Sequence, residues 1–194
     1  MRRFRRLCVY CGSSIGVDPA YAAAAEATGR LLAAQGIGLV YGGGSVGLMG
    51  TVAAAAREAG GEVIGVIPEK LQDLELGMEG LTELRIVPDM HARKQQMADL
   101  SDGFIALPGG YGTLEELFEA ITWLQLGYHD KPVGLLDVAG YYQPLVAFLK
   151  HTVAEGFVRP LHAPLVQVAD RPEALLHQLA TVELPRLEQW IDEV

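Results

Sequence analysis

The sequence contains few of the residues that bind metals or form disulfides. Among its 194 residues there are two cysteines and five histidines. Cys8 and Cys11 spell C-x-x-C, but a redox pair belongs at a helix N-terminus and a zinc site needs further ligands. Both cysteines fall on an expected strand, and the histidines have no ligand spacing. We therefore expect structural thiols, no metal and no cofactor.

Basic residues are also scarce. The chain has 15 Lys and Arg against 24 Asp and Glu, which gives a formal net charge of -9. Because nucleic-acid binding draws on clustered Lys and Arg, this balance argues against a nucleic-acid partner, whereas a mononucleotide needs only one local cationic site. Arg2, Arg3, Arg5 and Arg6 form a short basic tip that is typical of a solvated terminus.

Long apolar runs are missing as well. No stretch reaches the roughly 18 apolar residues of a membrane span, and residues 7–14 break into glycine and serine too early for a signal peptide. We expect a cytoplasmic protein without a membrane partner. The length suffices for one well-buried core and not for two, so we expect a single domain over residues 1–194.

Short β-branched runs alternate with longer helical ones along the chain. This alternation of apolar strands and helices predicts an α/β fold, a doubly wound, Rossmann-like parallel sheet with helices on both faces. Residues 68–80 have no clear pattern. The expected strands cover residues 7–10, 37–41, 62–67, 81–87, 104–107, 133–137 and 165–168. The expected helices cover residues 19–35, 48–59, 89–100, 114–126 and 142–155, with a last one from 172.

Three glycine-rich turns follow predicted strands, at the sheet edge where such folds bind ligands. They are Gly12-Ser13-Ser14, residues 42–45 and residues 109–113, and the last two lead into helices whose free amides and dipole favour a phosphate. Only glycine lets backbone donors come so near an anion. The turns therefore predict an anion site, with Ser13, Gly43 and Gly44 among its contacts.

The second turn also satisfies the G-x-G-x-x-G pattern of dinucleotide folds. Here the pattern follows the second strand, and the third strand ends at Ile67-Pro68, so only Glu69 could take a ribose hydroxyl. A nicotinamide-dependent oxidoreductase would also need a second nucleotide site, which a chain of this length barely accommodates. This enzyme class is one alternative to the interpretation developed below.

The helix after the third turn allows two interpretations. Thr113 and Glu116 have the spacing of a capping box, a purely structural device. On the other hand, Glu115 and Glu116 place two carboxylates at a helix start that suits a phosphate, so they need a separate purpose or a cation. Arg93 and Lys94 could supply the cation from the helix after the fourth strand, although lone basic residues in a first turn are ordinarily exposed.

Together the motifs resemble the LOG ("Lonely guy") family of cytokinin riboside 5′-monophosphate phosphoribohydrolases. The likeness runs from about Leu7 to Ala169. The motifs that match are Gly-Ser-Ser at 12–14, Tyr-Gly-Gly-Gly at 41–44, Met-His-Ala-Arg-Lys at 90–94 and Pro-Gly-Gly-Tyr-Gly-Thr-Leu-Glu-Glu at 108–116. The family is often labelled "lysine decarboxylase", but the sequence shows no pyridoxal-phosphate lysine context.

The resemblance implies a dimeric Rossmann-like enzyme that cleaves adenosine monophosphate (AMP) and its N6-prenylated relatives into ribose 5-phosphate and free base. It implies that Arg93 and Glu116 are catalytic. The further nucleotide contacts that it implies are Glu75, Lys94, Gly109, Gly110, Tyr111, Gly112, Thr113, Leu114, Glu115 and Thr122. A non-catalytic nucleotide carrier or sensor is the second alternative, because it needs the turns and a cation but no acid at the ribose.

Overall fold

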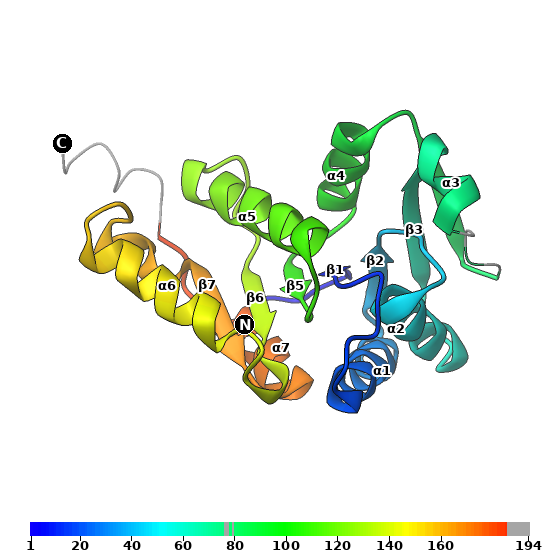
Figure 1. The fold of residues 1–194 in the computed structure, drawn as a ribbon, viewed down its shortest axis with the longest axis horizontal. Helices are drawn as coiled ribbons and strands as arrows, with labels where there is room; N and C mark the ends of the chain where they lie inside the picture. Colours follow the sequence, from blue (N-terminus) through cyan, green and yellow to red (C-terminus); the bar gives the residue numbers. More distant parts are fainter. Residues whose placement is uncertain (76–77, 79, 186–194) are drawn as a thin grey trace.

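The computed structural model describes residues 1–75, 78 and 80–185. In this part of the chain seven parallel strands form one sheet in the order β4-β3-β2-β1-β5-β6-β7 (Figure 1). The strands are β1 (Arg6–Tyr10), β2 (Gly38–Tyr41), β3 (Val63–Pro68), β4 (Glu83–Val87), β5 (Phe104–Ala106), β6 (Val133–Leu136) and β7 (Val166–Ala169).

Helices cover both faces of the sheet, so the predicted doubly wound, Rossmann-like fold is confirmed (Figure 1). One face carries α1 (Pro19–Ala34), α2 (Gly47–Glu58) and α7 (Pro172–Thr181). The other carries α4 (Met90–Asp99), α5 (Tyr111–Leu126) and α6 (Gln143–Ala154). The short elements are α3 (Glu69–Glu75) and the 3-10 helices η1 (Val138–Gly140) and η2 (Pro160–Leu165).

The central strand β1 shows why the strand sequences do not alternate with polar residues. Leu7 and Val9 pack into the core on the α1 side, whereas Cys8 and Tyr10 pack into the core on the α4 side. A parallel strand covered on both faces must be apolar at every position. None of the described helices is both long and apolar enough to cross a bilayer.

The helices predicted to begin near residues 19 and 89 are both present, and an aspartate caps each of them. The Asp18 carboxylate accepts a hydrogen bond from the amide of Ala20 at 2.9 Å, directly before Pro19 opens α1. The Asp89 carboxylate accepts from the amide of Ala92 at 2.8 Å and caps α4. Each side chain satisfies an amide that has no acceptor inside its helix.

The helices differ from the sequence analysis at two places. Residues 68–80, which show no clear pattern in the sequence, contain the short helix α3. The capping box is wrong, because α5 begins at Tyr111 with Gly110 as its N-cap. Thr113 is therefore inside the first turn and cannot cap it. The glycine-rich turn allows the helix to begin earlier than the threonine signal indicates.

The strand order reverses between β1 and β5, and this reversal brings the glycine-rich turns together. The amide of Gly12, after β1, donates to the carbonyl of Pro108, after β5, at 3.0 Å. The amides of Leu48 and Met49, at the start of α2, donate to the carbonyl of Gly12 at 3.0 and 3.3 Å. In open α/β sheets such a switch point is where ligands bind.

Candidate nucleotide site

A cleft of about 210 Å³ opens at this switch point. Its walls come from the turns after β1 and β5, from the starts of α2 and α4, and from the first turns of α5. The lining residues are Cys11, Gly12, Ser13, Met49, Met90, Arg93, Gly110, Tyr111, Gly112, Thr113, Glu115 and Glu116. Most of the residues that the sequence places in the site therefore meet in one cavity.

Arg93 is buried at the bottom of this cleft and is only 6% exposed. One terminal nitrogen, Nη2, donates to the carbonyl of Gly42 at 3.1 Å. The other, Nη1, lies 4.0 Å from the Glu116 carboxylate and 3.7 Å from the sulfur of Met90. Lone basic residues in a first helical turn are ordinarily exposed, but α4 turns Arg93 inward against the glycine turn after β2.

Glu116 is also nearly buried, at 9% exposure, and lies on the inner face of α5. Its charge acts on the two neighbouring thiols of β1 and the turn after it. Burial raises the pKa values of Cys8 and Cys11, Glu116 raises them further, and Arg93 partly opposes the shift. The thiols therefore stay protonated and unreactive, as expected for structural cysteines.

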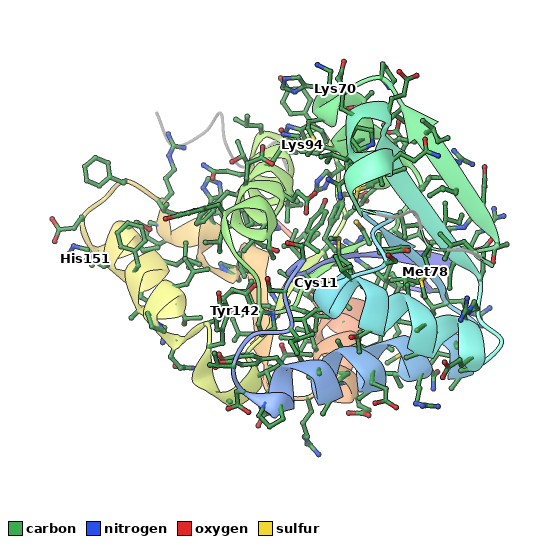
Figure 2. The ribbon with its side chains drawn as sticks, turned by 45° about the vertical axis from the view of Figure 1, so that its right-hand side comes forward. Cys11, Lys70, Met78, Lys94, Tyr142 and His151 are labelled. Atoms are coloured by element: carbon green, nitrogen blue, oxygen red, sulfur yellow. The ribbon has the colours of Figure 1, made fainter. Side chains whose placement is uncertain are left out.

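Lys94 is buried as well, but it faces α5 rather than the cleft (Figure 2). Its ammonium donates to Glu115 at 2.5 Å and to Glu119 at 2.9 Å. Burial lowers the pKa of Lys94, but the hydrogen bonds to the two carboxylates outweigh that effect and raise it. Lys94 thus ties α4 to α5 beside the Arg93–Glu116 pair.

Sequence reasoning missed Glu119. It lies four residues after Glu115, so the two carboxylates share one side of α5 and can bind the same cation. This i, i+4 spacing is the feature of the sequence that could have identified Glu119. Leu114 is half-buried on the same helix and, among the described residues, is not part of the cleft lining.

The start of α5 offers backbone donors to the cleft. The first bond inside the helix runs from the amide of Leu114 to the carbonyl of Gly110 at 3.1 Å, so the amides of residues 110–113 have no acceptor within the helix. These amides and the positive end of the helix dipole favour an anion. The Tyr111 side chain is 94% exposed and leaves this end open.

The remaining predicted contacts are spread more widely. Ser13 lines the cleft, whereas Gly43 and Gly44 are buried and do not belong to its described lining. Thr122 is exposed farther along α5, where its hydroxyl donates to the carbonyl of Phe118 at 2.7 Å. Glu75 is the last residue of α3, and its side chain lies outside the described part of the structure.

Gly42 is the glycine of the second turn that the site requires. A Cβ atom at this position would lie 2.0 Å from Nη2 of Arg93. We therefore expect Gly42→Ala to push the guanidinium out of place and to lower turnover by roughly tenfold or more, since misplaced catalytic groups lose orientation. Steady-state kinetics checks this, with Ala27→Ser, which adds one heavy atom at an exposed position of α1, as the control. Unchanged turnover in Gly42→Ala would show that the close packing is not needed.

The fold and the cleft define a class of protein. A doubly wound sheet, a switch-point cavity, helix-start amides without acceptors inside their helix and a buried Arg–Glu pair are the parts of a Rossmann-like protein whose cleft suits a phosphate-bearing ligand. Residues 49–179 match the family model described as "Possible lysine decarboxylase". This chain belongs to that family, which is the LOG family.

Two relatives in sequence are plant proteins. The chain is 55% identical over 177 residues to "Probable cytokinin riboside 5'-monophosphate phosphoribohydrolase LOGL2" of Oryza sativa subsp. japonica, covering 91% of this chain and 72% of the relative. It is 53% identical over 177 residues to "Cytokinin riboside 5'-monophosphate phosphoribohydrolase LOG3" of Arabidopsis thaliana, covering 91% and 82%. The resemblance read from the motifs is confirmed.

Solved structures with the same fold carry a different description. The molybdenum cofactor carrier protein of Chlamydomonas reinhardtii is 25% identical, with a TM-score of 0.68, over 91% of this chain and 98% of that one. The molybdenum cofactor binding protein of Rippkaea orientalis is 26% identical, with the same TM-score of 0.68, over 91% and 96%. One fold thus supports proteins with different names, and the site must decide between them.

Proposed function

We propose that this protein hydrolyses the N-glycosidic bond of a nucleoside 5′-monophosphate. The substrates are AMP and N6-prenylated cytokinin riboside 5′-monophosphates, and the products are free base and ribose 5-phosphate. The observation that carries the proposal is the buried carboxylate of Glu116, 4.0 Å from the Arg93 guanidinium in a cleft that the start of α5 also lines. The names of relatives at 53–55% identity support the same activity.

The 5′-phosphate is bound at the start of α5 in this proposal. The amides of residues 110–113, together with the turn at Gly12 and Ser13, surround one end of the cleft. Backbone donors and a helix dipole suit a phosphate and demand no clustered Lys or Arg. This explains how a chain with a net charge of -9 can bind an anionic ligand.

The ribose then lies beside Glu116. Breaking the N-glycosidic bond builds positive charge on the sugar ring, and a carboxylate beside the ring stabilises that charge. Glu116 also orients or activates the attacking water. Arg93, fixed by the Gly42 carbonyl, holds the carboxylate and helps to neutralise the phosphate or the departing base.

A nucleotide carrier is the alternative that a specific observation favours. The fold resembles that of a molybdenum cofactor carrier protein and a molybdenum cofactor binding protein, at 25% and 26% identity. A carrier needs the anion site but has no use for a carboxylate beside the ribose. Mass spectrometry of AMP recovered after incubation with the purified protein separates the two functions. The hydrolase yields adenine and ribose 5-phosphate, whereas a carrier returns AMP intact.

We also propose that the protein forms a homodimer through the surface between α5 and α6. This surface holds an apolar groove of about 380 Å³ with Phe118 and Thr122 in its lining. Helix α6 is apolar, yet none of its residues is fully buried, and Phe148 is 57% exposed. Symmetric pairing would cover such a face, and it would bring Thr122 toward the partner subunit.

We expect light scattering to give the mass of a dimer at micromolar concentration, and Phe118→Glu to give a monomer. A charge in the centre of an apolar interface is costly to bury. Ala27→Glu is the matched control, because Ala27 is exposed on α1, on the opposite face of the sheet. A parent protein that elutes as a monomer would refute the dimer.

We expect EDTA to leave turnover unchanged. The proposed chemistry uses side chains and backbone amides only. Among the described residues, no group of at least three His, Cys, Asp or Glu side chains is placed to hold a metal ion. Adenine release before and after chelation is the measurement. Loss of turnover that a divalent ion restores would contradict the metal-free mechanism.

The cytoplasmic location stays a prediction of the sequence.

A further inference from the structure

The carbonyl groups of residues 107–109, in the turn before α5, each accept a hydrogen bond from another part of the chain. The carbonyl of Leu107 accepts a hydrogen bond from the hydroxyl of Tyr142 at 2.6 Å. The next carbonyl, of residue 108, accepts the amide of Gly12 at 3.0 Å. The carbonyl of Gly109 accepts the hydroxyl of Tyr141 at 2.5 Å. Two adjacent tyrosines after β6 thus fix the turn that forms the anion site.

The segment that carries these tyrosines is itself firmly held. The buried carboxylate of Asp137 accepts the amide of Tyr142 at 2.7 Å and the side-chain amide of Gln143. Between them the chain turns sharply through Ala139, at φ 50°, and Gly140, at φ 76°. Ala139 is the one non-glycine residue with positive φ in the described part of the chain. Residues keep such a conformation where the surroundings impose it, which is common near functional sites.

The ring of Tyr141 is also restrained. It packs edge-on against Tyr21 of α1, with ring centroids 5.6 Å apart, and against Tyr142 at 5.0 Å. Such edge-to-face contacts favour one orientation of the ring. The hydroxyl therefore stays aimed at the carbonyl of Gly109 from the rim of the site, where Tyr141 is 39% exposed.

Because the peptide bond is planar and trans, the hydrogen bond from Tyr141 to the carbonyl of Gly109 also sets the direction of the next amide. The carbonyl oxygen and the amide hydrogen of one peptide unit point in opposite directions. Because the carbonyl of Gly109 points to Tyr141, the amide of Gly110 in the same unit points the other way, and Gly110 lines the cleft. Fixing one end of the unit therefore fixes the direction of the other.

We propose that Tyr141 is a positioning residue that orients the amide of Gly110 toward the 5′-phosphate of the nucleotide. The inference rests on the proposed function for the identity of the anion. Without the hydroxyl, the peptide unit between Gly109 and Gly110 can rotate, and the phosphate loses a charge-assisted hydrogen bond. Base and ribose contacts are unaffected, so the loss falls on ligands that carry the phosphate.

The test is Tyr141→Phe, which keeps the ring contacts and removes only the hydroxyl. We expect the KM for AMP to rise about tenfold while kcat changes less than about twofold, because the lost contact is made in substrate and transition state alike. Calorimetry should show ribose 5-phosphate bound about tenfold more weakly, with adenine inhibition unchanged. The Tm should shift by less than about 4 °C. Tyr128→Phe, at a side chain 77% exposed after α5, is the control and should match the parent.

The outcomes separate this inference from the proposed function. Equal affinity of parent and Tyr141→Phe proteins for ribose 5-phosphate would overturn the role of Tyr141, whatever the turnover. Equal weakening of ribose 5-phosphate and adenine binding would also overturn it, since it would show a general structural role. A parent protein that binds ribose 5-phosphate but leaves AMP intact would refute the proposed hydrolysis alone.

Discussion

Glu116→Gln is expected to lower the release of adenine from AMP by on the order of a hundredfold or more. Glutamine has nearly the shape of glutamate but no negative charge, so it cannot stabilise the cation that develops on the ribose. Binding of AMP should persist through the amides at the start of α5 and through Arg93. Steady-state kinetics with a binding measurement on the same preparations separates the two effects.

The free energy of unfolding of Glu116→Gln shows whether the variant loses activity because it no longer folds. Glu116 is not part of a capping box, since Thr113 lies inside α5. Arg93 keeps its bond to the Gly42 carbonyl, so we expect the free energy of unfolding to change by about 1 to 2 kcal/mol. Glu173→Gln, at an exposed carboxylate in the first turn of α7, is the control. Turnover at the parent rate in Glu116→Gln would mean that Glu116 is not the catalytic carboxylate.

Arg93→Lys is expected to lower turnover by a comparable factor, on the order of a hundredfold. The guanidinium reaches the Gly42 carbonyl with one nitrogen and faces Glu116 with the other. A lysine ammonium is a single point charge on a flexible chain and cannot hold both partners in the same geometry. The measurement is kcat and kcat/KM for AMP.

The control for Arg93→Lys is Arg30→Lys, because Arg30 forms an exposed pair with Glu26 on α1, which covers the opposite face of the sheet. It should leave kinetics unchanged, since exposed pairs contribute little. Parent-like turnover in Arg93→Lys would show that charge alone suffices at this position, and that the fixed guanidinium is not part of the mechanism.

Most of the fold could be predicted because its signals are local. Apolar runs between glycine-rich joints indicate strands covered on both faces, and Asp18 and Asp89 mark helix starts by their own chemistry. Helix α3 was missed because its seven residues are too few to show a helical period. The start of α5 was misplaced because Thr113 carries a stronger capping signal than the glycines before it.

The site was predictable in its residue types but not in its contacts. Motifs pointed to Arg93 and Glu116, yet the Arg93 guanidinium is held by the carbonyl of Gly42, which is 51 positions away in the sequence. The bond from Tyr141 to Gly109 spans 32 positions and has no local pattern. Such pairings arise from the order of strands in the sheet, so a single sequence cannot reveal them.

The most direct test follows the fate of excess AMP incubated with the purified protein. Chromatography should show adenine and ribose 5-phosphate appearing in equal amounts, in quantities that exceed the protein many times over. AMP recovered unchanged would contradict the proposed hydrolysis and support a carrier. Adenosine and inorganic phosphate as products would contradict it as well, because the bond broken would then be the phosphate ester and not the N-glycosidic bond.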